Sequence, residues 1–328
     1  MSADCTARTA ALAVEALHVE LALAPKPGLV TPSSRGSHED MDARSFAASI
    51  GALAPYFADC VALGRGGAAF AELQARGLQA EGQMLQATGG VNTHRGAIFV
   101  LGLLCAAAGV QGRERGRVYA CELGAVVRSR WAAELAKPLS TVSTVSTSST
   151  TNAASLALAI SHGERVRQRY GLGGARAQAQ AGFPVLFACS LPNLRAALRR
   201  GATPAQACTQ ALLQTMAVLD DTNVVHRGGP QALDWVQQQA RQFLHAGGVY
   251  RTDWRSRLQA LGRQMQALRL SPGGSADLLA AAWFLHRCTP AHGRPQGARV
   301  AARPILPHRS DPRPPALHES VHPVSGAS

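Results

Sequence analysis

Lysine is almost missing from this chain of 328 residues, in which only Lys26 and Lys137 occur. Arginine therefore supplies nearly all of the cationic charge, and the formal net charge is +13. Such a charge attracts polyanions, among them nucleotide triphosphates, CoA-like pyrophosphates and nucleic acid. A high arginine content across a whole proteome explains it equally well. The charge alone does not choose between these explanations.

Cysteine pairs with metal-ligand spacing are also absent. The seven cysteines are odd in number, include no CxxC sequence and stand mostly among alanine and leucine. This pattern is typical of free thiols in a reducing compartment rather than of a zinc site or a disulfide framework.

Long apolar runs and several well-known motifs are missing too. No uncharged apolar run of about 18 residues is present, so a membrane span is not predicted. Asp4, Arg8 and Glu15 interrupt the N-terminal segment, so we predict no signal peptide and expect a cytoplasmic protein. The chain lacks GxxxxGK[ST], GxSxG, HExxH, DDxxD and the protein-kinase motif set. P-loop, zincin, prenyl-synthase and kinase chemistry are therefore disfavoured.

The residues that are present favour helices. Aromatic residues make up 5% of the chain and charged residues 16%, whereas alanine is abundant and apolar residues recur at helical spacing. We predict an all-α fold, with one domain of about ten helices joined by glycine-rich loops over residues 1–288. A flexible Ser/Thr-rich loop is predicted at 140–151 and a disordered Pro/Arg-rich tail at 289–328. The segments expected to form the helices are 7–23, 41–63, 66–87, 96–108, 114–136, 153–169, 204–219, 231–246, 253–270 and 275–287.

Six loops combine glycine with a polar or charged group next to a predicted helix end. They are PKPGLV (25–30), GSHEDMD (36–42), TGGVNTHRGAIF (88–99), GLGGAR (171–176), DDTNVVHRGG (220–229) and SPGGSADLL (271–279). Glycine lets a backbone approach a ligand closely, helix N-termini bind anions, and arginine supplies counter-charge. Each loop alone is explained as a helix connection, but the six together favour a shared polyphosphate site. Its candidate contacts are Lys26, Gly89, Gly90, His94, Arg95, His226, Arg227, Gly273 and Gly274.

Adjacent carboxylates stand at one predicted helix end. Asp220 and Asp221 are expected to close a long helix, where each would oppose the helix dipole by roughly 0.3–1 kcal/mol. Two kinds of partner would offset this cost. One is Mg²⁺ carried by a nucleotide, and the other is the neighbouring pair His226 and Arg227.

Further carboxylates stand near predicted helix starts. The segment 36–42 contains Glu39, Asp40 and Asp42, which form either an acidic first turn or the second half of a metal site. Asp277 lies in the first turn of the last predicted helix. Capping and the helix dipole explain Asp277 without any further function.

A family resemblance rests on these segments taken together. In order and spacing, PKPGLV, GSHEDMD, GGVNTHRGAIFVLGLLCAAAG, SHG at 161–163, GGAR, DDTNVVHRGG and SPGGSADLLAA resemble the triphosphoribosyl-dephospho-CoA synthase family over residues 10–287. The resemblance implies conversion of ATP and 3′-dephospho-CoA to 2′-(5″-triphosphoribosyl)-3′-dephospho-CoA and adenine, with no nucleic acid or membrane partner. The text LPNLRAALRRGATPAQA is similar to the branch that serves malonate decarboxylase, whose acyl-carrier subunit is loaded by a downstream transferase.

The resemblance also implies residue roles. Departure of adenine builds positive charge on the ribose, which a carboxylate would stabilise. The predicted catalytic residues are Asp42 and Asp221, and the predicted Mg²⁺ ligands are Asp40, Asp42, Asp220 and Asp221. Arg176 joins the expected phosphate contacts. The chain departs from the family at Gln178, where a glutamate is usual, and in the segments 140–151 and 289–328.

Two other functions fit the same residues. A hydrolase similar to ADP-ribosylglycohydrolases would also be helical with carboxylate-bound Mg²⁺, and water would replace the 2′-hydroxyl as nucleophile. A non-catalytic polyanion binder would explain the charge and would bind with a strong salt dependence. The chain shows no interleaving of basic and aromatic residues that would support binding of nucleic acid.

Overall fold

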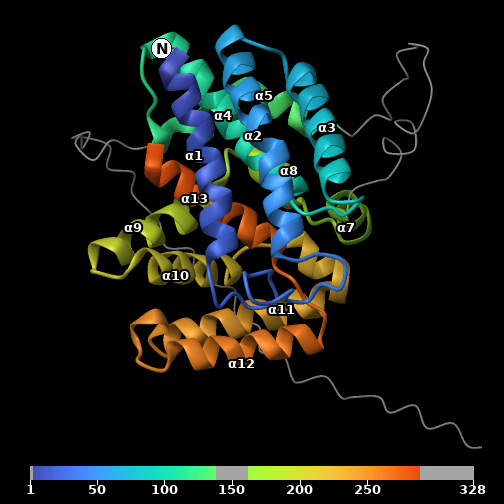
Figure 1. Ribbon diagram of the computed structural model, residues 1–328, viewed down its shortest axis with the longest axis vertical. Coiled ribbons are helices and arrows are strands. Elements are labelled where there is room, and N and C mark those ends of the chain that lie inside the picture. The colour runs from blue at the N-terminus through green and yellow to red at the C-terminus, as the bar shows by residue number, and fades with distance from the viewer. Residues whose placement is uncertain (1–2, 138–161, 289–328) are drawn as a thin grey trace, which may run out of the picture. The chain divides into compact units, whose positions relative to one another are not determined.

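The computed structural model describes residues 3–137 and 162–288, and these residues form an all-α fold without strands, as predicted. The segments 140–151 and 289–328 lie outside the described residues. Twelve α-helices occur in the described part of the chain (Figure 1). They are α1 (Ala3–Ala22), α2 (Ala43–Gly66), α3 (Phe70–Ala87), α4 (Arg95–Arg115), α5 (Leu123–Ala136), α7 (His162–Tyr170), α8 (Gly174–Gln180), α9 (Leu191–Arg199), α10 (Pro204–Met216), α11 (Thr222–His245), α12 (Trp254–Ala267) and α13 (Gly273–Cys288).

Local sequence explains where several helices begin and end. Thr203 caps α10 by accepting a hydrogen bond from the backbone N–H of Gln206, and Pro204 occupies the first helical position, as the sequence predicts. Two helices, α8 and α9, were not expected. The helix predicted from residue 114 begins only at Leu123, because α4 continues to Arg115.

Helix α4 forms the centre of the core. All of its residues from Val100 to Gly112 are buried, and α2 packs along it with unusually close backbones. A Cβ on Gly64 would overlap the carbonyl of Ala106, and one on Gly109 would overlap the carbonyl of Val61. Glycine on both helices therefore fixes the distance between α2 and α4.

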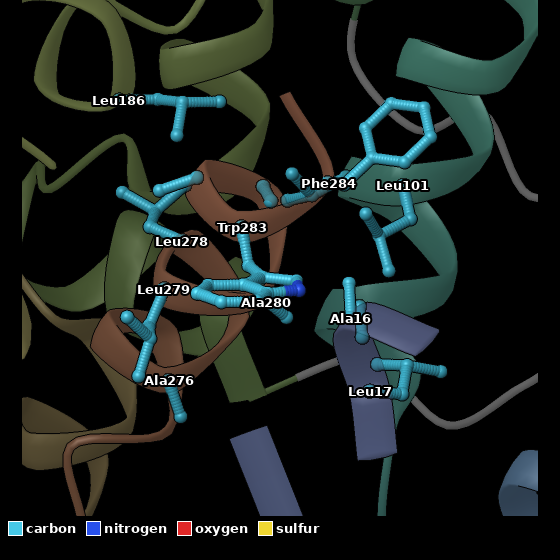
Figure 2. Packing of buried hydrophobic residues seen from close by; sticks show 14 of the residues in the cluster. Ala16, Leu17, Leu101, Leu186, Ala276, Leu278, Leu279, Ala280, Trp283 and Phe284 are labelled. Carbon is cyan, nitrogen blue, oxygen red and sulfur yellow. The ribbon is translucent and has the colours of Figure 1, made fainter. Parts of the chain in front are cut away.

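Helix α13 packs through the middle of the molecule. Figure 2 shows Trp283 and Phe284 facing Ala16 and Leu17 of α1 and Leu101 of α4, with Leu186 beyond Leu278 on the other side. The indole N–H of Trp283 also donates to Glu15 at 3.1 Å. Since α13 is held on both sides, its first turn is fixed against the neighbouring helices.

Two helices, α2 and α4, are long and apolar enough to cross a membrane by length and composition. Most of the apolar window of α4 (83%) is buried inside the protein, as in the core helix of a soluble domain. Helix α2 is less buried, but it packs against α1, α3 and α4 (Figure 1). Both helices thus serve the core of this fold.

We predict that Gly64→Ala lowers the free energy of unfolding by about 1–3 kcal/mol, because the added methyl pushes α2 away from α4. The matched control is Gly51→Ala on the same helix, where no atom of the described residues lies within 4 Å of the new methyl. That variant should gain up to about 1 kcal/mol from helix propensity. Urea denaturation of both variants measures the difference, and equal effects would contradict the close approach.

Candidate active site

A buried carboxylate, Asp221, joins the first turns of two helices. It is 2% exposed and is the N-cap of α11, where it accepts a hydrogen bond from the backbone N–H of Asn223 at 3.1 Å. It also accepts from the N–H of Gly274 (3.2 Å) and from the N–H and hydroxyl of Ser275 (2.8 and 3.0 Å) at the start of α13. Burial raises the pKa of Asp221, whereas these hydrogen bonds oppose the rise.

The prediction that Asp220 and Asp221 close a helix is wrong. Helix α10 ends at Met216, and the carboxylate of Asp221 faces the positive N-terminal ends of α11 and α13. The helix dipoles therefore stabilise the negative charge of Asp221, so no cation is needed to offset an unfavourable dipole. Asp220 is exposed.

A second desolvated carboxyl, Asp277, lies on α13 one turn further along. It reaches across to the first turn of α4, where the backbone N–H of Ala97 donates to it and a Cβ on Gly96 would overlap its Oδ2. Burial and the charges of Asp221 and Glu20 raise the pKa of Asp277 well above its ordinary value. From the sequence alone, only a local capping role is predicted for Asp277. Gly96 was the available signal, because a glycine in a first helical turn often makes room for a neighbour.

His94, the N-cap residue of α4, is a buried neutral group. Its Nδ1 lies 2.7 Å from the hydroxyl of Ser49, and its Nε2 has no hydrogen-bond partner among the described residues. Burial, with the charges of Lys26 and His18, lowers the pKa of His94 to about 3. His94 therefore carries no charge for a phosphate contact near neutral pH, although it retains hydrogen-bonding capacity.

Lys26 is committed to an internal ion pair. Its Nζ lies 2.6 Å from Oε1 of Glu20 and donates to the backbone carbonyl of Glu20 at 2.5 Å. Only 1% of the Lys26 side chain is exposed, and burial lowers its pKa against the opposing effect of Glu20. The phosphate contact predicted for Lys26 would require this pair to open.

These groups form one electrostatically coupled set at the ends of several helices, which we call the buried cluster. Its members are Glu20, Lys26, His94, Asp221 and Asp277, contributed by α1, the loop after it, α4, α11 and α13. The positive charge of Lys26 is balanced within the cluster by the negative charge of Glu20. The buried cluster is therefore suited to proton transfer and to stabilising positive charge, more than to holding phosphates.

An outer network ties three of the glycine-rich loops together. Arg227 of α11 donates to the backbone carbonyls of Ser37 and Arg269, both at 3.2 Å, and its Nη2 lies 3.0 Å from Nδ1 of His38. The Nε2 of His38 lies 2.9 Å from the hydroxyl of Ser271. Burial and the charge of Arg227 lower the pKa of His38 to about 4. The segments 36–42, 220–229 and 271–279 therefore meet, as expected.

Two further predicted segments reach the start of α11. A Cβ on Gly174 would press on the side chain of Thr222, and one on Gly163 would lie 3.5 Å from the Thr222 hydroxyl. Arg176, however, is used inside the fold, where it donates to the backbone carbonyls of Leu135 (2.6 Å), Glu134 (3.1 Å) and Lys137 (2.6 Å).

Asp42 stands apart from the buried cluster. It caps α2 by accepting from the backbone N–H groups of Arg44 and Ser45, and it lies 3.6 Å from Arg35. Hydrogen bonds from the helix start and the nearby arginines lower its pKa. It borders a polar hollow of about 200 Å³ formed by residues 31–35 and 42–44.

The remaining predicted contacts lie at or near the surface. Arg95 pairs with Glu81 at 2.8 Å, and Gly89 and Gly90 are exposed with open space around them. His226 is exposed, and partial desolvation with the charges of Arg165 and Arg227 lowers its pKa. Gly273 and Gly274 form the first turn of α13, where Gly273 packs on Asn223 and Gly274 on Asp221.

The four predicted Mg²⁺ ligands are not assembled by this structure. Asp40 and Asp220 are exposed, Asp42 is a cap, and Asp221 accepts four protein hydrogen bonds. The described residues contain no group of three or more histidine, cysteine or acidic side chains that could hold a metal ion. A metal site made by the protein alone does not fit these residues.

The fold and the buried cluster define an all-α protein with two desolvated carboxyls at the meeting point of helix N-termini. The chain belongs to the ATP:dephospho-CoA triphosphoribosyl transferase family, whose model matches residues 6–295, and it is therefore a pentosyltransferase. No solved structure matches it.

Three relatives share most of their length with this chain, and each is described as a probable 2-(5″-triphosphoribosyl)-3′-dephosphocoenzyme-A synthase. The protein from Stutzerimonas stutzeri (strain A1501) is 43% identical over 296 residues, which are 89% of this chain and 95% of the relative. The protein from Pseudomonas aeruginosa (strain UCBPP-PA14) is 42% identical over 88% and 92% of the two chains. The protein from Vibrio cholerae serotype O1 (strain M66-2) is 37% identical over 84% and 86%.

We predict that His94 makes folding sensitive to acid. Its pKa is about 3 in the folded chain, against an ordinary value of 6.5, so the unfolded state binds the proton first as pH falls. Stability supplied by neutral His94 is therefore lost between about pH 6.5 and 3, by up to about 1.4 kcal/mol per pH unit. Urea midpoints of the protein and of His94→Asn, measured from pH 7.5 to 4.5, should diverge accordingly.

Asparagine is a favoured N-cap residue, so this variant should fold. His245→Asn, at an exposed histidine, is the matched control and should leave the pH dependence unchanged. Parallel curves for the wild-type protein and His94→Asn would show that His94 is charged in the folded chain.

Proposed function

We propose that this chain transfers the triphosphoribosyl group of ATP to the 2′-hydroxyl of 3′-dephospho-CoA and releases adenine. The family and the names of its relatives support the two substrates. We further propose that the product becomes the prosthetic group of a malonate decarboxylase acyl-carrier subunit, through a downstream carrier-protein transferase, and that the protein is cytoplasmic. The resemblance of residues 191–207 to that branch supports this choice.

The observation that carries the proposal is that Asp221 and Asp277 both lie at the helix starts of α4, α11 and α13, where the charge of Asp221 acts on Asp277. Cleavage of the bond between adenine and ribose creates positive charge at the anomeric carbon. A negative carboxylate with fixed geometry stabilises that charge, and a protonatable carboxyl can move the proton that the reaction requires. The buried cluster supplies both kinds of group.

The phosphates of both substrates require cations outside the buried cluster. We propose contacts from Arg95 and Arg227, together with His226 and the open glycines Gly89 and Gly90, because these residues lie at partly or fully exposed positions beside the same helix starts. Arg95 and Arg227 have partners of their own at these positions, whereas Lys26 and Arg176 are held inside the fold and would have to leave their partners to join them.

We propose that Mg²⁺ enters bound to ATP, as part of the substrate. The described acidic side chains do not gather into a ligand set, and the hydrogen bonds to Asp221 already occupy both of its oxygens. No step assigned to the residues of this chain therefore passes through the metal.

Asp42 keeps a proposed catalytic role that is simple to test, because asparagine caps a helix as well as aspartate does. Asp42→Asn should therefore fold normally. A loss of adenine release would support a contact between Asp42 and substrate through the hollow that it borders. Unchanged turnover would limit Asp42 to capping α2.

We expect the purified protein to release adenine from Mg–ATP only when 3′-dephospho-CoA is present, as measured by liquid chromatography. Adenine release at the same rate without 3′-dephospho-CoA would indicate a hydrolase, and its absence under both conditions would leave only polyanion binding.

Asp221→Asn should reduce adenine release at least about 100-fold, because it removes the fixed negative charge. It should also lower the free energy of unfolding by about 1–3 kcal/mol, since the new NH₂ group cannot accept from the backbone N–H groups. The matched control is Asp253→Asn, which removes an exposed N-cap carboxylate on α12. That control should retain full activity.

A further inference from the structure

Asp277 and Asp221 differ in their exposure and in the number of hydrogen bonds that they accept. Asp221 is fully buried and accepts four hydrogen bonds. Asp277 is partly exposed as a residue, although its carboxyl is desolvated. Among the described residues, its one hydrogen bond comes from the backbone N–H of Ala97. The Asp277 carboxyl therefore keeps hydrogen-bonding capacity that this one bond does not use.

A glycine at position 96 leaves space for the carboxyl of Asp277. Asp277 does not cap its own helix, because Asp221 already accepts from the first N–H groups of α13. It is held instead against the first turn of α4, where its Oδ2 occupies the space that a side chain at position 96 would fill. Gly96 therefore leaves room for a carboxyl that comes from a different helix.

The surroundings of Asp277 favour its protonated form. The negative side chains of Asp221 on α11 and Glu20 on α1 both act on it, together with burial. Lys26, the lysine of the buried cluster, is paired with Glu20, and His94 is neutral. A protonated carboxyl has one O–H to donate and still accepts hydrogen bonds.

We propose that Asp277 is the catalytic acid that protonates adenine as it leaves the ribose. This assignment rests on the proposed transfer reaction and names a residue for its proton transfer. The bond from the anomeric carbon to adenine breaks, its electron pair goes to the base, and a ring nitrogen takes the proton of Asp277. The 2′-oxygen of 3′-dephospho-CoA bonds to the anomeric carbon, and its proton passes to the Asp277 carboxylate, which regenerates the acid.

In this scheme Asp221 positions Asp277 in addition to supplying the fixed negative charge. Its hydrogen bonds fix the first turn of α13, which carries Asp277 one turn later. Its charge also keeps the proton on Asp277 between turnovers. The helix starts of α4 and α13 thus hold the acid in place without consuming its donor.

The test compares two leaving groups in the full-length protein and in Asp277→Asn. With Mg–ATP the variant should lose about 100-fold or more in kcat, the usual contribution of an acid catalyst. With a ribose 5-triphosphate that carries 4-nitrophenolate at the anomeric carbon, it should lose less than about 10-fold, because that group departs without protonation. Asp253→Asn is the matched control and should retain both activities.

Equal losses with both substrates would show that Asp277 is structural and would overturn the proposal. Activity of Asp277→Asn within about threefold of wild type on ATP would also overturn it. If the wild-type protein releases no adenine in the presence of 3′-dephospho-CoA, the proposed function itself fails, which is a separate outcome.

A measurement on the wild-type protein keeps the test valid if Asp277→Asn does not fold. Acid catalysis needs the protonated carboxyl, so kcat with ATP should fall as pH rises through the pKa of Asp277. The 4-nitrophenolate substrate should show no such fall. Identical pH profiles for the two substrates would overturn the assignment.

Discussion

The first turns of α11 and α13 are held together by one buried carboxylate, and the rest of the site depends on that contact. The four hydrogen bonds to Asp221 come from residues 2 and about 50 positions further along the chain. If they were lost, buried donors at two helix starts would be left without partners, at a cost of about 1–3 kcal/mol each. Because α13 also packs between α1 and α4, the position of its first turn determines where Asp277 meets α4.

Helix N-termini usually attract anions, and here the protein supplies those anions itself. Asp221 occupies the starts of α11 and α13, and Asp277 occupies the start of α4. These termini are therefore not open to the phosphates of a substrate in this conformation. The molecule therefore has an inner acidic region and outer arginines such as Arg227. A reaction at the ribose of a nucleoside triphosphate needs this arrangement, because carboxylates stabilise positive charge on the ribose and arginines bind the phosphates.

Sequence reasoning recovered the helical class, the start of α10 and the meeting of segments 36–42, 220–229 and 271–279, since these depend on local patterns and on shared chemistry. It did not recover partners that only the tertiary fold reveals. From the sequence, Lys26 is predicted to be a free cation, but the fold pairs it with Glu20. Arg176 is predicted to contact phosphate, but the fold bonds it to backbone carbonyls at the end of α5. Asp221 was placed at the wrong end of a helix, because nothing local in the sequence marks the end of α10 at Met216.

The glycines of the recognised segments fall into two physical classes that a sequence cannot separate. At Gly96, Gly174 and Gly274, the space of a missing side chain is taken by Asp277, Thr222 and Asp221, so these glycines serve the assembly of the site. At Gly89, Gly90 and Gly229 the same space is open, and each has a positive φ of 66°, 93° and 75°. A Cβ at the open positions would meet no atom of the described residues within 4 Å, so packing among these residues does not explain the glycine there. Glycine at these positions then has two physical explanations, the left-handed backbone and the close approach of a ligand from solvent.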